Sequence, residues 1–236
     1  MIRRHIAVIV LLLSPLLAFS QAGGPAVEHL RQGLQLFQQE RYPDAAQVFR
    51  AVIADPQAGS ARPEAYYWAA RSFAAVDQLG EAEQHLEHFL ASYPSHPLYP
   101  DALYQKGRLM YLQGDADSAI QVLGTYVDEY PNADLVSSGY FWIAEALYSL
   151  GQIDEAGRIY GKIVAEYPKS VKLEAARYRL SLIEFKQREE ELLRLLQWSH
   201  QEALKAVEEF QRRERAYEQA LAAYRSGLAP AAAPGG

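Results

Sequence analysis

Three histidines come closer than any other residues of this chain to a metal-binding pattern. His85 and His88 are one helical turn apart, and His96 follows eight residues after His88. Imidazole nitrogen is a common ligand of zinc and other transition metals. No cluster of Asp or Glu completes a site, however. We therefore interpret His85 and His88 as solvent-facing helix residues, and we expect neither a metal nor a cofactor.

Catalytic patterns are equally weak. Ser199 and His200 are adjacent, so a helix would direct them to different faces. The run Glu189-Glu190-Glu191 is typical of a solvated helix face. The sequence contains no GxSxG, Walker, GxGxxG, HExxH or EF-hand motif. Since it has no cysteine, a thiol nucleophile, a disulfide framework and thiolate metal sites are excluded. We expect no catalytic residue and no enzyme.

The composition is that of a folded, acidic protein. Of the 236 residues, 50% are hydrophobic and 22% are charged, and the formal net charge is −6 at pH 7. Such a chain has enough apolar residues to form a core. It has no basic excess that would attract nucleic acid in general, so we expect no nucleic-acid partner.

The first 22 residues are typical of a secretory signal peptide. Arg3 and Arg4 precede an apolar run from Ile6 to Phe19, and small residues suited to cleavage follow. We therefore expect export to the periplasm. The run has 14 residues and contains Pro15, whereas a membrane span needs about 20. An inner-membrane anchor formed by an uncleaved signal is the alternative.

The strongest signal in the sequence is a repeat of 37 residues. Small and large apolar residues recur at this interval in three columns: Ala45, Ala82, Ala119 and Ala156; Phe49, Leu86, Leu123 and Tyr160; and Gly33, Ala70, Gly107, Ala144 and Ser181. In the third unit, helical apolar spacing over residues 101–112 breaks at Gly114-Asp115 and resumes over residues 116–130. Each unit therefore predicts two antiparallel helices, which bury their apolar stripes only when the units stack.

These columns resemble those of the tetratricopeptide repeat (TPR), in which a proline also closes the unit, as Pro94, Pro131 and Pro168 do here. The period exceeds the usual 34 residues, with the extra length in the loops between units. Such long loops are similar to those of bacterial cell-envelope TPR proteins, namely the Tol-Pal-associated periplasmic protein and the lipoprotein of the outer-membrane β-barrel assembly machine. This chain lacks the cysteine needed for lipidation. The resemblance implies an all-α helix-turn-helix solenoid of four repeats over residues 27–170, at about 27–57, 63–95, 100–132 and 137–169.

The C-terminal part differs in composition from the repeats. Residues 21–169 hold 19 acids and 10 bases, net −9, whereas residues 170–236 hold 10 acids and 11 bases, net +1. No Gly or Pro occurs from Leu173 to Arg225, and many apolar residues follow a 3-4 spacing. We interpret residues 171–226 as a partial fifth repeat that continues into one long helix or a helical hairpin. It would cap the solenoid, form a coiled coil or bind a partner, and residues 227–236 would be a disordered tail.

The resemblance also implies where a partner binds. From the second unit onward an aromatic residue lies three positions before the small residue of the first helix, and another lies four positions after it in every unit except the second, which has Ala74. In the second to fourth units a charged residue stands beside the small residue. In the TPR pattern this helix faces the concave side. The expected partner-binding residues are Phe37, Tyr67, Arg71, Tyr104, Arg108, Tyr111, Phe141, Glu145, Tyr148, Tyr178 and Phe185. The alternative is that the aromatic side chains only fill space between neighbouring first helices.

The function implied by this reasoning is a non-enzymatic scaffold or adaptor of the bacterial periplasm or cell envelope. Its concave groove would bind segments of other envelope proteins. Peripheral association with a membrane complex and a homodimer formed through the C-terminal helix are further alternatives for its partners. A second function from another class is binding of peptidoglycan or carbohydrate, because aromatic side chains stack on sugar rings as well as on peptides.

Overall fold

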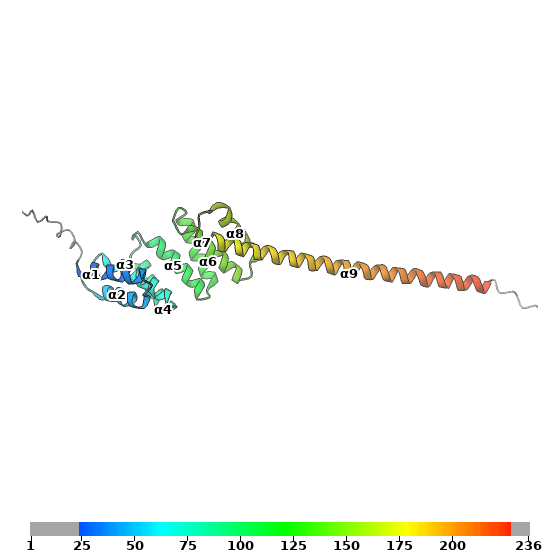
Figure 1. Cartoon of the computed structure of the whole chain (residues 1–236), viewed down its shortest axis with the longest axis horizontal. Coiled ribbons are helices and arrows are strands. Elements are labelled where there is room, and N and C mark those ends of the chain that lie inside the picture. The colour runs from blue at the N-terminus through cyan, green and yellow to red at the C-terminus, as the bar shows by residue number, and fades with distance from the viewer. Residues whose placement is uncertain (1–23, 228–236) are drawn as a thin grey trace, which may run out of the picture. The chain divides into compact units, whose positions relative to one another are not determined.

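The computed structural model describes residues 24–227, and every regular element in that range is a helix (Figure 1). The helices are α1 (Pro25–Gln38), α2 (Tyr42–Ala54), α3 (Ala61–Ala75), α4 (Leu79–Ser92), α5 (Tyr99–Leu112), α6 (Ala116–Glu129), α7 (Val136–Ser149), α8 (Ile153–Glu166) and α9 (Leu173–Gly227). This confirms the predicted all-α class. The expected signal peptide, residues 1–22, and nearly all of the expected C-terminal tail lie outside the described residues.

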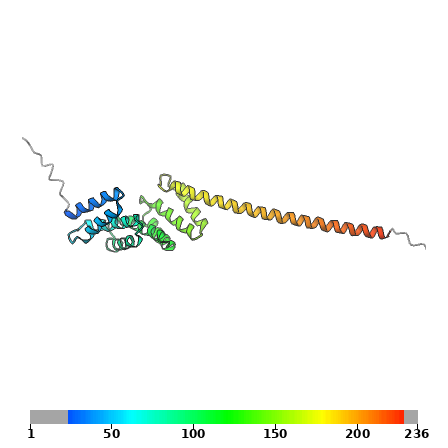
Figure 2. The same ribbon diagram turned by 60° about the horizontal axis from the view of Figure 1, so that its bottom comes forward.

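The chain divides into two compact units between Arg177 and Tyr178. The repeat unit contains α1 to α8 and the first residues of α9, and the tail unit contains the rest of α9. From α1 to α8 each helix packs on the next one, and α1 also contacts α3, α3 contacts α5, and α5 contacts α7. The odd-numbered helices therefore form one layer of the solenoid and the even-numbered helices the other (Figures 1 and 2).

The 37-residue columns form the core of the repeat unit. Phe49, Leu86, Leu123 and Tyr160 of the even-numbered helices are at most 2% exposed. Glycine lets the paired helices approach these side chains: a Cβ atom at Gly107 would lie 2.5 Å from Leu123 Cγ, and one at Gly33 would lie 2.5 Å from Phe49 Cε1. The small-residue column is thus required by close helix packing, as the sequence predicts.

The turns inside the repeats share a backbone conformation at the same 37-residue interval. Glu40, Asp77, Gly114 and Gly151 follow the first helix of successive units and have φ values of 60°, 61°, 86° and 77°. This left-handed conformation suits glycine and costs free energy for a residue with a Cβ atom. The last two units therefore make the turn with the favoured residue, and the first two carry local strain at Glu40 and Asp77.

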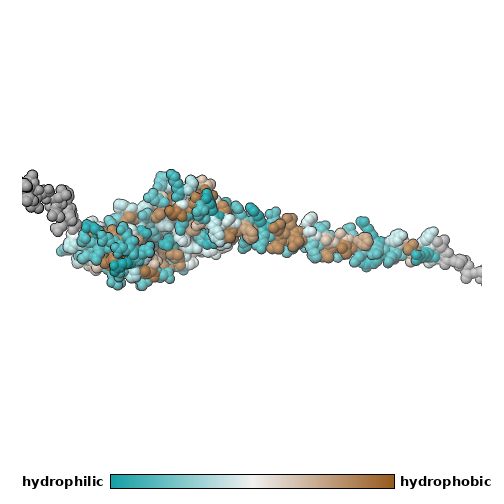
Figure 3. Space-filling view, viewed as in Figure 1, coloured by the Kyte–Doolittle hydropathy of each residue, from teal (hydrophilic) through white to brown (hydrophobic). Residues whose placement is uncertain are grey.

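Helix α9 is one unbroken helix of 55 residues, so the hairpin alternative is wrong. Helical propensity explains its continuity, because the stretch lacks Gly and Pro up to Arg225. Most of its large apolar side chains are exposed, and Figure 3 shows them as hydrophobic patches among hydrophilic ones along the helix. No helix within residues 24–227 combines the length and the apolar character needed to span a bilayer.

Candidate ligand groove of the repeat unit

The odd-numbered helices of the repeat unit border an open groove of about 680 Å³. Residues from α3 and α5 supply most of its wall, and single residues of α1, α2 and α7 and the segments that lead into α7 and α9 complete it. Its lining consists of Phe37, Tyr42, Tyr67, Arg71, Ala74, Ala75, Asp101, Tyr104, Gln105, Arg108, Asp134, Leu135, Ser138, Val171 and Lys172. Stacking of the repeats is what brings these residues, distant in sequence, to one surface.

Arg71 lies among three aromatic rings at one end of the groove. Its guanidinium carbon is 4.7 Å from the ring centroid of Trp68, 5.1 Å from that of Phe37 and 5.7 Å from that of Tyr67. The negative faces of aromatic rings attract such a cation. Burial raises the pKa of the Tyr67 hydroxyl, and the nearby charge of Arg71 partly offsets that rise. The rings thus hold the guanidinium in place without neutralising its charge.

Two further cations share the ring of Trp142. Arg108 lies 5.4 Å and the Lys172 ammonium 4.8 Å from its centroid, and Lys172 is also 4.9 Å from that of Phe141. Burial, followed by the charge of Arg108, lowers the pKa of Lys172. Two like charges this close to one ring create a positive potential in the groove that favours an anion.

Two acids also line the groove. Burial raises the pKa of Asp101, and the charge of Asp134 adds to the rise, whereas Arg71 opposes it. Even so, neither acid lies within ion-pair distance of a lining cation: among the described residues, Arg71, Arg108 and Lys172 form no salt bridge of 4.0 Å or less. The groove therefore offers three cations to an incoming carboxylate.

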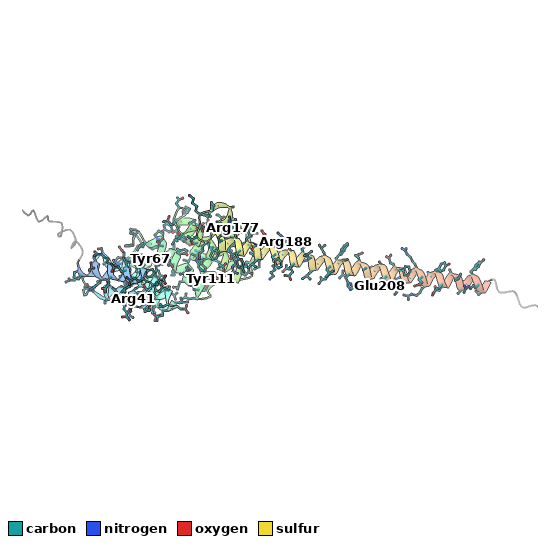
Figure 4. The ribbon with its side chains drawn as sticks, viewed as in Figure 1. Arg41, Tyr67, Tyr111, Arg177, Arg188 and Glu208 are labelled. Carbon is teal, nitrogen blue, oxygen red and sulfur yellow. The ribbon has the colours of Figure 1, made fainter. Side chains whose placement is uncertain are left out.

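The structure brings some of the expected binding residues together and separates others. Five line the groove, namely Phe37, Tyr67, Arg71, Tyr104 and Arg108. The rings of Tyr67 and Tyr104 are 2% and 6% exposed, so they contribute only edges, and the Tyr104 hydroxyl accepts a hydrogen bond of 3.1 Å from Trp142 Nε1. These tyrosines therefore pack in the core while bordering the groove (Figure 4 labels Tyr67).

The remaining expected residues lie elsewhere. Tyr111, Phe141, Glu145 and Tyr148 do not line the groove. Glu145 is only 6% exposed and accepts a hydrogen bond of 2.6 Å from the Tyr160 hydroxyl, because α7 turns this carboxylate toward α8. The last two expected residues, Tyr178 and Phe185, belong to the tail unit, where they are exposed.

Sequence reasoning missed several residues that line the groove or contact its cations. Trp68 and Trp142, which hold the cations, are two repeats apart and share a 37-residue column with Gln105. The periodicity that revealed the other columns would have found this one. Asp134 and Lys172 had no such signal, since they lie in the loops that precede α7 and α9 and only the fold places them at the groove.

The three histidines of α4 and its following loop pack against aromatic rings. His88 stacks on Tyr66 with centroids 4.1 Å apart, and His96 lies 5.3 Å from Phe89. His85 Nδ1 is 2.7 Å from the carbonyl oxygen of Glu81, and burial lowers the pKa of this imidazole. His88 is exposed, as expected, whereas His85 is only partly exposed because Phe73 of α3 lies against its ring. In the described part of the chain, no three acidic or histidine side chains gather where they would bind a metal.

These features define an all-α repeat protein with an aromatic and cationic groove. Tetratricopeptide repeat models match residues 30–97, 101–133 and 139–170, so the chain belongs to the tetratricopeptide repeat family. Proteins of this family generally mediate protein–protein interactions. No curated protein matches the chain.

Solved structures with the same fold are similar over the repeats. The type IV pilus biogenesis factor PilW is 21% identical with a TM-score of 0.55, over 64% of this chain and 66% of PilW, just under two thirds of that protein. TPR-like repeats of a kinesin light chain homologue from Podospora anserina are 19% identical with a TM-score of 0.56, over 71% of this chain and 90% of theirs. MamA is 22% identical with a TM-score of 0.53, over 63% of this chain and 81% of MamA. At these identities the likeness establishes the fold.

Proposed function

We propose that this protein is a non-enzymatic adaptor of the bacterial periplasm or cell envelope that binds segments of partner proteins in the groove of its repeat unit. The observation that carries the proposal is the set of three groove cations, Arg71, Arg108 and Lys172, each held against an aromatic ring and none paired with an acid of the described chain. Pre-positioned cations bind carboxylates at a low cost in side-chain entropy.

The expected ligand segment follows from the chemistry of the groove. Carboxylates of the segment would lie on the cations, and its apolar side chains would contact the edges of Phe37 and Tyr42 and the surface of Val171. Asp101 and Asp134 would reject a densely acidic segment at the middle of the groove, so they favour isolated carboxylates in an otherwise apolar or neutral segment. This arrangement supports protein binding rather than catalysis.

The envelope location rests on the N-terminal pattern of the sequence, in which Arg3 and Arg4 precede a short apolar run. Peripheral association with a membrane complex fits the same proposal, with the groove as the site of attachment. PilW, which shares the fold, is described as a type IV pilus biogenesis factor. That role belongs to PilW, and it makes envelope assembly machinery a sensible first place to search for partners.

Photocrosslinking in intact bacterial cells tests the proposal. A benzoylphenylalanine at Gln105, inside the groove, should capture defined envelope proteins, whereas the same group at the exposed Gln121 of α6 should not. The double variant Arg71→Ala/Arg108→Ala should reduce capture at Gln105 at least about tenfold, equivalent to about 1.4 kcal/mol of binding. Arg158→Ala, which removes an exposed cation of α8, is the matched control.

Two results would contradict the proposal. Equal capture at Gln105 and Gln121 would show that the groove is not a binding site. Capture of cell-wall fragments at Gln105 would instead favour the carbohydrate alternative. The deep burial of Tyr67 and Tyr104 speaks against that alternative, because a sugar ring stacks on the face of an aromatic side chain and these faces are covered.

A further inference from the structure

A second interaction surface runs along the tail unit, separate from the groove. Steps of four and three residues in alternation, from Tyr178 to Tyr224, define one line of side chains on α9, the α9 seam. Apart from Glu189, Ser199 and Arg213, every residue of the seam is apolar or aromatic. A seam with this seven-residue period is the surface that pairs helices in a coiled coil.

The large side chains of the α9 seam are exposed to solvent. Phe185, Phe210 and Tyr224 are 69%, 67% and 67% exposed, and Leu192 and Leu196 are exposed to a similar extent. A helix in water gains most of its stability by packing an apolar face. An apolar line of this length therefore indicates that another helix covers it.

The order of residues along the seam indicates which helix that is. When two copies of α9 lie antiparallel with Glu189 of one beside Arg213 of the other, both copies make this acid–base contact. The same offset places Tyr178 beside Tyr224 and Phe185 beside Tyr217 of the second copy. It also places the large Leu196 beside the small Ala206 and the large Leu182 beside the small Ala220, so large and small side chains complement each other at these two positions.

Residues that flank the seam match at the same offset. Lys186 of one copy falls beside Glu214 of the other, and Leu193 falls beside Val207. A parallel, in-register pair would instead set Glu189 against Glu189 and Arg213 against Arg213, and would bring Glu209 near Glu214. Like charges facing each other across a helix pair destabilise it. The antiparallel pair has one such contact, between the two Glu202 side chains, but it makes the Glu189–Arg213 and Lys186–Glu214 contacts twice each. On balance the charges favour the antiparallel orientation with this offset.

We propose that α9 is a dimerisation helix that pairs antiparallel with a second copy of this chain, over residues 178–224, with Glu189 beside Arg213. The overlap of the two helices would be about 70 Å long at 1.5 Å per residue. Each dimer carries two groove-bearing repeat units. This inference does not depend on what the grooves bind.

Disulfide trapping in the purified full chain tests the orientation, because the chain has no cysteine of its own. Leu196→Cys and Ala206→Cys place single thiols at seam positions that face each other in the proposed dimer. Each variant alone should stay unlinked, because its two thiols lie ten residues apart along the helix pair, about 15 Å, and a disulfide needs Cα atoms within about 7 Å. A mixture of the two variants should form linked heterodimers. Links within either variant alone, or a chain of monomer mass by light scattering, would overturn the proposal.

Charge exchange tests the register. Glu189→Arg sets Arg against Arg twice per dimer and should raise the dimer dissociation constant at least about tenfold. The double variant Glu189→Arg/Arg213→Glu should restore it, because each contact again joins an acid and a base. Glu190→Arg, one residue off the seam, should leave the dimer unchanged (Figure 4 labels the neighbouring Arg188). Failure of the double variant to rescue, with helicity by circular dichroism intact, would show that Glu189 and Arg213 do not meet.

Discussion

The repeat unit and the tail unit treat their large apolar side chains in opposite ways. In the repeat unit, Phe49, Phe89 and Tyr160 are fully buried, because two layers of helices cover one another. In the tail unit, Phe210 and Tyr217 are more than 60% exposed on a single helix. In a solenoid, each repeat buries the apolar faces of its helices against the repeats next to it in the sequence. The tail helix leaves its apolar side chains available for another molecule.

The largest expected effect is the loss of stability when one aromatic side chain is truncated in the repeat unit, compared with the same truncation in the tail unit. Phe89→Ala removes a ring that is 0% exposed and contacts Tyr67, so it should lower the free energy of unfolding by about 3–5 kcal/mol. Trp198→Ala on α9 removes a side chain that is 62% exposed, and the change should stay within about 0.5 kcal/mol. Denaturant unfolding followed by tryptophan fluorescence and circular dichroism measures both.

Similar losses in the two variants would break the comparison. In particular, a loss of several kcal/mol for Trp198→Ala would mean that the face of α9 that carries Trp198, outside the seam, packs as tightly as the core of the repeats. The α9 seam would then not be the principal contact surface of that helix.

The second largest effect is the change in stability when glycine is replaced by alanine. Gly107 and Gly124, both in the repeat unit, form a matched pair for this test. Gly107→Ala would place a Cβ atom 2.5 Å from Leu123 Cγ and 3.2 Å from its backbone nitrogen, so the helices must move apart, at a cost of about 1–3 kcal/mol. Gly124→Ala meets nothing within 4 Å and lies inside α6, where alanine is the better helix former. It should stabilise the protein by about 0.5–1 kcal/mol. Melting temperatures of the two variants should therefore move in opposite directions.

If Gly107→Ala is neutral, the paired helices are not held at the distance that the structure gives. Such a result would also weaken the groove, because Arg108 is the next residue and its position over Trp142 depends on where α5 lies. A stabilised Gly124→Ala beside a destabilised Gly107→Ala would show that the small-residue column, and not glycine in general, sets the packing.

The same contrast explains how much could be predicted from the sequence. Periodicity reports any feature that recurs in every repeat, so the small-residue column, the second-helix core and the two-helix units were all predictable. Features that occur once had no such signal. Lys172 reaches the groove from the loop before α9, and Glu145 bonds to Tyr160 although Arg71 and Arg108 occupy the same repeat position. Lys172 lies where the chain no longer follows the repeat pattern. Glu145 follows the pattern, but its carboxylate accepts a hydrogen bond from the Tyr160 hydroxyl and does not reach the groove.

The smallest expected effect is the pH dependence of stability that comes from the protonation of His85, a partly buried residue of the repeat unit. Burial lowers the pKa of His85 from its ordinary 6.5, with the charges of Arg50 and His88 adding to the shift and the Glu81 carbonyl and carboxylate opposing it. The rings of Tyr66 and Phe73 lie against the half-buried imidazole, whereas the histidine of α9, His200, is exposed. The unfolded chain therefore binds a proton at His85 more readily than the folded chain does. The stability that depends on neutral His85 is complete above about pH 6.5 and is lost as the pH falls from there through the folded pKa.

A variant that cannot titrate isolates this contribution. His85→Gln is neutral throughout and keeps a polar group near the Glu81 carbonyl, so the protein should lose less stability than the unaltered chain between about pH 7.5 and about pH 5.5. All other groups titrate in both proteins, and the difference between the two stability profiles therefore belongs to His85. Parallel profiles would mean that His85 is as hydrated in the folded protein as in the unfolded chain. A steeper loss in His85→Gln would mean that the folded protein favours the charged imidazole, which would reverse the assignment of burial as the dominant influence at this position.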